Sequence, residues 1–292
     1  MKTRVISSAL VVFVGLAPAL IGGPAFALLM IGLGAAGYRE YLDLAARVNP
    51  GAIGSYHLFG YAVVIALGLA ALLDATATTL FAVATLATAA PLVRLFSSAM
   101  HPGAFSGWSL ASSGSLYLGL PVYAAVAIRS SPGTIDATWL SDLAGRLSFG
   151  WESAPRGLAW ALTAILATWV GDSAAYLAGG SRGKRKLAQS ISPNKTVEGA
   201  VGGLAGSMAV GAVAFQSFGL GQWWLGLAAG GVIGLAGQIG DLAESVLKRQ
   251  AGVKDSGATI PGHGGVLDRI DALLFAFPAG LLLAAGFERI GA

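Results

Sequence analysis

The chain has 292 residues, of which 55% are hydrophobic and 11% charged, whereas about a quarter of the residues of an ordinary soluble protein are charged. This composition argues against a water-soluble fold and predicts an integral membrane protein. Because the chain has no Cys, disulfides and Cys-ligated zinc are excluded.

Apolar runs about as long as the roughly 20 residues that cross a bilayer recur along the chain, and polar residues gather between them. We therefore expect an all-α, polytopic integral membrane protein with about nine transmembrane helices, near residues 5–20, 22–37, 56–73, 75–93, 110–128, 157–179, 198–218, 222–245 and 268–287. The first run also imitates a signal peptide. Because apolar sequence continues to Gly37 and more spans follow, we expect this run to stay in the chain.

The placement of Lys and Arg in short loops predicts the orientation. With nine crossings and a cytoplasmic N-terminus, all but four of the 18 basic residues lie on the cytoplasmic side. The four that remain outside are Arg129, Arg146, Arg156 and Arg289. The net charge of +4 then reflects topology and attraction to anionic lipids, and we expect no nucleic acid partner. Residues 130–156 are expected to form an external loop with a short interfacial helix.

Two predicted spans carry ionisable residues, which are costly inside a membrane and therefore mark functional positions. Asp172 lies in "TWVGDSAAYLAGG", before the cytoplasmic end of its span. In "GQIGDLAESVLKR", Asp241, Glu244 and Lys248 are spaced so that they share one helical face. The second pattern predicts a polar stripe along a membrane helix.

The segment "GHGGVLDRID" before the last span adds two more acids. Asp268 and Asp271 are three residues apart and point the same way on a helix. Under the predicted topology they lie with Asp172 and Asp241 at the cytoplasmic membrane boundary, beside clustered Lys and Arg. Carboxylates hold divalent cations and basic side chains neutralise phosphate oxygens, so the sequence predicts a site for both.

The basic loop "GGSRGKRKLAQSISPNKTVEG" leads into the next span. Ser192 or Thr196 is expected to cap that helix, with Glu198 in its first turn. Because the free amide groups of a helix start favour phosphate oxygens, Lys195 is a candidate phosphate contact.

Each of these features also has a structural explanation. Residues 184–186 form a basic cluster that a membrane anchor would also require. Asp268 and Asp271 also suit a helix N-terminus, and Asp172 also suits a buried ion pair. His263 is as readily a hydrogen-bonded loop residue as a ligand or base. The coincidence of these residues on one membrane face favours the functional interpretation.

The segment "SVLKRQAGVKDSGATIPGHGGVLDRID", from Ser245 to Asp271, resembles the signature of the phosphatidate cytidylyltransferases, or CDP-diacylglycerol synthases. The fixed positions of that signature are met by Ser245, Lys248, Arg249, Lys254, Asp255, Gly257, Ile260, Pro261, His263, Gly264, Gly265, Asp268, Arg269 and Asp271. The upstream stretches "GDSAAYLAGG" and "ISPNKTVEG" are also similar to the family. The resemblance is firm from about Trp169 to the end and looser before it.

The resemblance implies transfer of a cytidylyl group from CTP to phosphatidic acid, with Mg²⁺ required and a second cation left open. It implies catalytic residues Asp172, Asp241, Lys248, His263, Asp268 and Arg269, substrate-binding residues Lys184, Ser192, Asn194, Lys195, Thr196, Glu198, Arg249 and Lys254, and metal-binding residues Asp241, Glu244, Asp268 and Asp271. The expected location is the cell (inner) membrane, multi-pass, with the active site facing the cytoplasm. Membrane lipids are expected partners.

We expect one membrane domain over residues 1–292. Its helices in residues 1–130 face lipid or serve assembly, and the helices and cytoplasmic loops of residues 157–292 carry the catalysis. The small-residue helix faces are compatible with a homodimer. Two alternatives stay open: a transporter or channel, which also uses intramembrane acids, and a related lipid nucleotidyltransferase or CTP-using lipid kinase with another acceptor.

Overall fold

This computed structural model describes residues 14–50, 57–74, 77–97, 103–135, 137–146, 154–260 and 264–289. Its helices are α2 (Gly23–Val48), α3 (His57–Leu72), α4 (Ala77–Ser97), α5 (Ala104–Arg129), α6 (Thr138–Arg146), α7 (Arg156–Arg182), α8 (Val197–Phe218), α9 (Trp223–Gln250), α10 (Leu267–Ile270) and α11 (Leu273–Arg289). Four short strands form two antiparallel pairs, β1 (Thr134–Ile135) with β2 (Ala154–Pro155) and β3 (Lys186–Ala188) with β4 (Ser192–Thr196).

The all-α membrane prediction is confirmed in its coarse form. Among the described residues, five helices are long and apolar enough to cross a membrane: α5, α7, α8, α9 and the stretch Leu267–Arg289. Two further apolar helices, within α3 and α4, are shorter. Every predicted span after the first overlaps a helix, while most of the first lies in residues 1–13, outside the described part. The count of nine crossings and the cytoplasmic N-terminus stay predictions.

The chain forms two compact units, and the division does not follow chain order. The first unit comprises, among the described residues, 14–18, Gly23–Ala127 and Glu244–Asp271. The second comprises Ala19–Gly22, Ile128–Ala243 and residues 272–289. The signature segment therefore packs with the N-terminal helices, although it follows them by more than a hundred residues in the sequence. The prediction of one membrane domain divided near residue 130 is not tested by this grouping.

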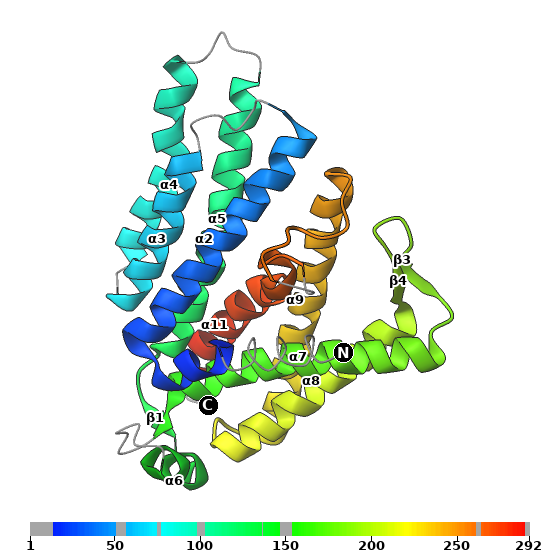
Figure 1. Cartoon of the computed structure of the whole chain (residues 1–292). Coiled ribbons are helices and arrows are strands. Elements are labelled where there is room, and N and C mark those ends of the chain that lie inside the picture. Colours follow the sequence, from blue (N-terminus) through cyan, green and yellow to red (C-terminus); the bar gives the residue numbers. More distant parts are fainter. Residues whose placement is uncertain are drawn as a thin grey trace. The chain divides into compact units, whose positions relative to one another are not determined.

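In the first unit, α2 to α5 run side by side (Figure 1). Val63 and Leu67 of α3 pack against Ala87 of α4 in a buried cluster that also includes Leu116 of α5. The helices approach closely where one of them carries Gly. A Cβ atom at Gly34 of α2, for example, would overlap the side chain of Val122 on α5.

In the second unit, α7 and α8 lie side by side along most of their length, joined by the β3–β4 hairpin (Figure 1). A Cβ atom at Gly171 of α7 would overlap the hydroxyl of Ser207 on α8, and that hydroxyl donates a hydrogen bond to the carbonyl oxygen of Ala167 (2.8 Å). Likewise, a Cβ atom at Gly230 of α9 would overlap the Ser207 carbonyl oxygen. The Gly residues thus let backbones touch, which is how helices associate in lipid.

The predicted helix within residues 130–156 is present as α6. Its Trp139 stacks on Phe218 of α8 and donates from its indole nitrogen to the carbonyl oxygen of Ser217 (2.9 Å). Trp139 is about half exposed, as suits an aromatic residue at a membrane interface. That α6 lies outside the cell and at the interface stays a prediction.

Candidate active site

The first polar group lies in the second unit, where the hairpin meets α9. Lys195, on β4, places its Nζ 2.5 Å from Oδ2 of Asp241. Both side chains are about one-third exposed or less. Asp172 of α7 is close enough for its charge to interact with those of Asp241 and Lys195. Three of the residues predicted from the sequence are therefore brought together here.

The start of α8 fixes where Lys195 lies. Thr196 is the N-cap, and its side chain accepts a hydrogen bond from the amide of Gly199 (3.1 Å). Thr196 is thus confirmed as the cap of the two candidates, since Ser192 begins β4 instead. Because Lys195 directly precedes the cap, the helix start and the hairpin together set its backbone position.

Glu198 is in the first turn of α8, as predicted. Its Oε2 accepts hydrogen bonds from the amides of Lys184 (3.0 Å) and Arg185 (3.2 Å), and the Arg185 Nε lies 3.4 Å from Oε1. The carboxylate therefore ties the segment between α7 and β3 to the start of α8. Its predicted contact with substrate stays a prediction.

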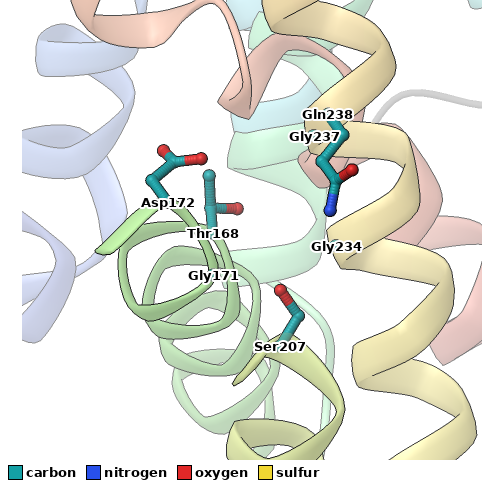
Figure 2. Close-up of a pocket in the computed structure, with 7 residues that line it drawn as sticks. All are labelled: Thr168, Gly171, Asp172, Ser207, Gly234, Gly237 and Gln238. Atoms are coloured by element: carbon teal, nitrogen blue, oxygen red, sulfur yellow. The ribbon is translucent and has the colours of Figure 1, made fainter. Parts of the chain in front are cut away.

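A small cavity of about 10 Å³ lies beside Asp172, among α7, α8 and α9. Figure 2 shows Thr168 and Asp172 from α7, Ser207 from α8 and Gln238 from α9 around it. Thr168 donates to the carbonyl oxygen of Ala164 (2.8 Å), and Gln238 Nε2 donates to that of Ala200 (3.0 Å). The cavity has room for about one water molecule, and Asp172 is the charged residue among those that line it.

The second polar group lies in the first unit and is built by the signature segment. Lys248 Nζ lies 2.6 Å from Oε2 of Glu244 and 2.6 Å from Oδ1 of Asp268. Glu244 is fully buried, and neither of its oxygens accepts a hydrogen bond of good geometry from the described residues. The ammonium group thus bridges two carboxylates, and that of Glu244 is fully buried.

Asp268 is held from its other side by the loop that precedes it. Its Oδ2 accepts from the amide of Ser256 (2.9 Å), the hydroxyl of Ser256 (3.0 Å) and the amide of Gly265 (2.8 Å). With Oδ2 occupied by three donors, Oδ1 is the oxygen that contacts the Lys248 ammonium group. The structure therefore confirms that the face shared by Glu244 and Lys248 is polar, and adds Asp268 to it.

The remaining predicted residues are placed less closely. Asp271 follows Asp268 by one turn, as predicted, and its amide donates to the Leu267 carbonyl oxygen (3.0 Å). Arg249 donates to the carbonyl oxygen of Val253 (3.0 Å), at the end of α9. Lys184, Asn194, Lys254 and Arg269 are exposed or partly exposed. His263, together with Pro261, lies outside the described residues.

One residue of this group was missed by the sequence prediction. Glu40 of α2 is 4% exposed and accepts four hydrogen bonds from residues of the signature segment. The donors are Ser256, Thr259, Val266 and Leu267. It lies just beyond the predicted span at 22–37, and no role was predicted for it. No spacing rule links a residue at position 40 to a loop more than two hundred residues later.

The first unit also contains a cavity of about 550 Å³ between the end of α2 and the loop after α9. Asp43 and Arg47 line it from α2, and Asp255 lines it from the loop. This volume is in the range of small-molecule pockets. Because the lining charges are mixed, with two acids and one base, we assign no phosphate to it.

The residues present fit a divalent cation in chemistry. Mg²⁺ prefers carboxylate oxygens, and these oxygens are what both groups offer. Glu244 is fully buried, and its contact of 2.6 Å with the Lys248 ammonium group shows that a positive charge is accepted beside this carboxylate. As the side chains are arranged in the described part of the chain, no three His, Asp or Glu residues form a metal cluster. Lysine ammonium groups instead contact the carboxylates of both groups.

The fold and these two groups define a multi-pass membrane protein with carboxylate and lysine clusters on its helices. Comparison with known proteins narrows the class. A model described as the cytidylyltransferase family matches residues 2–286, and the chain belongs to that family.

Three relatives, each named phosphatidate cytidylyltransferase, show the similarity in detail. The protein of Staphylococcus aureus (strain COL) is 47% identical over 132 residues, which is 44% of this chain and 50% of the relative. That of Staphylococcus saprophyticus is 48% identical over 130 residues, with the same two shares. That of Staphylococcus haemolyticus is 48% identical over 124 residues, or 42% of this chain and 47% of the relative. The chain spans about half the length of the curated relatives it matches.

Proposed function

We propose that this protein transfers a cytidylyl group from CTP to phosphatidic acid and releases pyrophosphate. The observation that carries the proposal is that Lys248 and Asp268 of the signature segment come together with Glu244, so that two carboxylates lie around one ammonium group. Membership of the cytidylyltransferase family supports the use of CTP. The relatives' name supports phosphatidic acid as the acceptor.

The reaction asks little of a general base. The phosphate monoester of phosphatidic acid is already anionic near neutral pH, so its oxygen attacks the α-phosphorus of CTP once the two are aligned. Catalysis then depends on neutralising phosphate charge and on in-line positioning. Lys195 and Lys248 supply positive charge, each beside a carboxylate that keeps it in place.

Mg²⁺, when bound, would neutralise phosphate oxygens and stabilise the leaving pyrophosphate. We assign its binding to the carboxylates predicted from the sequence, which are those of Asp241, Glu244, Asp268 and Asp271, with Asp172 in support. A second cation remains part of this proposal. In the absence of a cation the ammonium groups of Lys195 and Lys248 neutralise the acids. Their long, flexible side chains suit a move onto phosphate oxygens.

We assign substrate contacts to the residues predicted for them. Lys195 and the cap at Thr196 lie at a helix start, where amide groups favour phosphate oxygens. Lys184, Asn194 and Lys254 are exposed and available to a soluble nucleotide. The set is completed by Ser192, Glu198 and Arg249 for binding and by His263 and Arg269 for catalysis.

The chemistry also dictates the location. CTP is water-soluble and the acyl chains of phosphatidic acid stay in lipid, so the two phosphates meet at headgroup depth. We propose the cytoplasmic face of the cell membrane, with membrane lipids around the helices. A homodimer is compatible with the Gly-rich faces.

Purified protein in detergent tests the proposal. Pyrophosphate release is measured with CTP, phosphatidic acid and Mg²⁺ together and with each omitted in turn. We expect release only with all three. In a further reaction an isoprenoid lipid replaces phosphatidic acid. Release of pyrophosphate with the isoprenoid lipid but not with phosphatidic acid would favour a related lipid transferase. No release under any condition would refute the proposal.

A further inference from the structure

Glu40 is a buried acid with no part in the reaction as set out above. Its Oε1 accepts hydrogen bonds from the Thr259 hydroxyl (2.7 Å) and the Val266 amide (2.9 Å). Its Oε2 accepts from the Ser256 hydroxyl (2.8 Å) and the Leu267 amide (2.8 Å). One carboxylate therefore holds both ends of the stretch 256–267, which we call the signature loop.

The loop is shaped to receive this carboxylate. A Cβ atom at Gly257 would be 2.7 Å from Oε1 of Glu40, and one at Gly265 would overlap both Oε2 and the Ser256 hydroxyl. Both positions are Gly in this chain. Their lack of a side chain is therefore explained by the approach of Glu40, which comes from a helix far away in the sequence.

Ser256 connects Glu40 to Asp268. Its hydroxyl lies 2.8 Å from Oε2 of Glu40 and 3.0 Å from Oδ2 of Asp268, while its amide donates to the same Oδ2 (2.9 Å). A hydroxyl has one proton to donate, so the two carboxylates share it. Moving Glu40 would shift Ser256, and with it two of the three donors that hold Asp268 Oδ2.

The cost of burying Glu40 indicates what it does. A buried carboxylate is unfavourable unless hydrogen bonds or a cation compensate it. Within the described part of the chain no salt bridge to Glu40 is made, and four donors, all from the signature loop, satisfy it. The same four hydrogen bonds hold Ser256 and Thr259 on one side of the loop and Val266 and Leu267 on the other.

We propose that Glu40 is a positioning residue for the proposed cytidylyl transfer, on which this inference rests. Through Ser256 and the amide of Gly265, it orients Asp268 so that Oδ1 faces Lys248 and Glu244, where the two carboxylates would hold a cation. A Gln at position 40 would keep the size of the side chain. Its amide nitrogen donates instead of accepting, so it would oppose two of the four donors.

The test compares Glu40→Gln with Glu288→Gln, a matched loss of one charge at an exposed site on α11. For Glu40→Gln we expect kcat about 10- to 100-fold lower, the usual loss when a residue supporting a metal ligand is changed. KM for CTP should stay at the wild-type value, and the Mg²⁺ concentration for half-maximal rate should rise. Glu40→Asp keeps the charge and should recover part of kcat. Glu288→Gln should match the wild type.

Hydrogen exchange supplies a measurement that does not depend on activity. In Glu40→Gln the amides of Gly265, Val266 and Leu267 should exchange faster, and those of α8 should not change. Unchanged exchange in the loop, a wild-type kcat, or a general rise in exchange that includes α8 would each overturn the positioning role. If Glu40→Gln is not recovered folded, Ser256→Ala is used instead, because it removes the hydroxyl that connects Glu40 to Asp268. This variant should also have a lower kcat, and a wild-type kcat would overturn the positioning role of Glu40.

The proposed function and this inference fail differently. A wild-type protein without CTP-dependent pyrophosphate release would refute the function, and the catalytic part of the inference with it. The exchange experiment would still show whether Glu40 orders the signature loop.

Discussion

At the scale of single residues, the carboxylates of Asp241, Glu244 and Asp268 each lie against a lysine. Asp241 contacts Lys195, and Asp268 contacts Lys248 and three donors from its own loop. Such groups are costly to build in an apolar chain, which indicates that they serve chemistry.

Asp241→Asn tests the metal assignment. The change keeps the shape of the side chain and removes the charge that a cation needs. We expect pyrophosphate release to fall by at least about 100-fold, as for other losses of a transition-state contact, with expression and membrane insertion near normal. Full activity of Asp241→Asn in the purified protein would remove this residue from the metal site.

Lys195→Ala tests the phosphate contact. Because a hydrogen bond to a charged group contributes about 1.5–3 kcal/mol, we expect the KM for CTP to rise about 10-fold or more. Lys186→Ala is the control, since Lys186 is an exposed lysine on the neighbouring strand β3. Equal CTP kinetics for the two variants would exclude a role for Lys195 in nucleotide binding.

Lys248→Met tests the bridging ammonium through stability. It leaves the fully buried Glu244 without its positive partner, and breaking a buried pair in this way costs about 3–5 kcal/mol. We expect a lower melting temperature in detergent, and a partial recovery when Glu244→Gln is added. If Lys248→Met and the double variant Lys248→Met/Glu244→Gln have the same melting temperature, Lys248 and Glu244 do not depend on each other.

At the scale of helices, much was predictable because lipid imposes simple rules. The apolar runs located the described helices from α2 onward, and the cap at Thr196 followed from its position before an apolar run. Boundaries were less exact: α2 continues to Val48, eleven residues beyond the predicted end of its span, because Glu40 and its neighbours extend the helix past the apolar run.

Gly230 gives a test at this scale. A Cβ atom there would overlap the Ser207 carbonyl oxygen of the neighbouring helix, whereas Gly180 of α7 has open space around it. We expect Gly230→Ala to lower the melting temperature. Gly180→Ala should leave it unchanged or raise it slightly, because Ala favours a helix by about 1 kcal/mol over Gly. Equal effects would show that α8 and α9 do not need close contact.

The site was predicted in part. Local spacing correctly put Glu244 and Lys248 on one helical face, because a helix repeats every 3.6 residues. The pairing of Lys195 with Asp241 and the contact of Glu40 with the signature loop were not foreseen. Both join segments far apart in the sequence, and neither hydropathy nor spacing contains that information.

At the scale of the whole molecule, the expected orientation rests on the distribution of Lys and Arg. The natural absence of Cys makes it testable with single cysteines. In intact cells or sealed right-side-out vesicles, a membrane-impermeant thiol reagent should label Asp142→Cys on α6. It should label Lys186→Cys on β3 only after the membrane is opened. The reverse pattern would invert the topology, and with it the cytoplasmic site.

The central claim is that the nucleotidyl part of CTP, with its α-phosphorus, is joined to the lipid. The most direct measurement follows two isotopic labels in CTP, one on the α-phosphate and one on the γ-phosphate, with phosphatidic acid, Mg²⁺ and purified protein. We predict that the α label enters the lipid product and the γ label leaves as pyrophosphate. Transfer of the γ label to lipid would show a lipid kinase, and no label in lipid would contradict the account altogether.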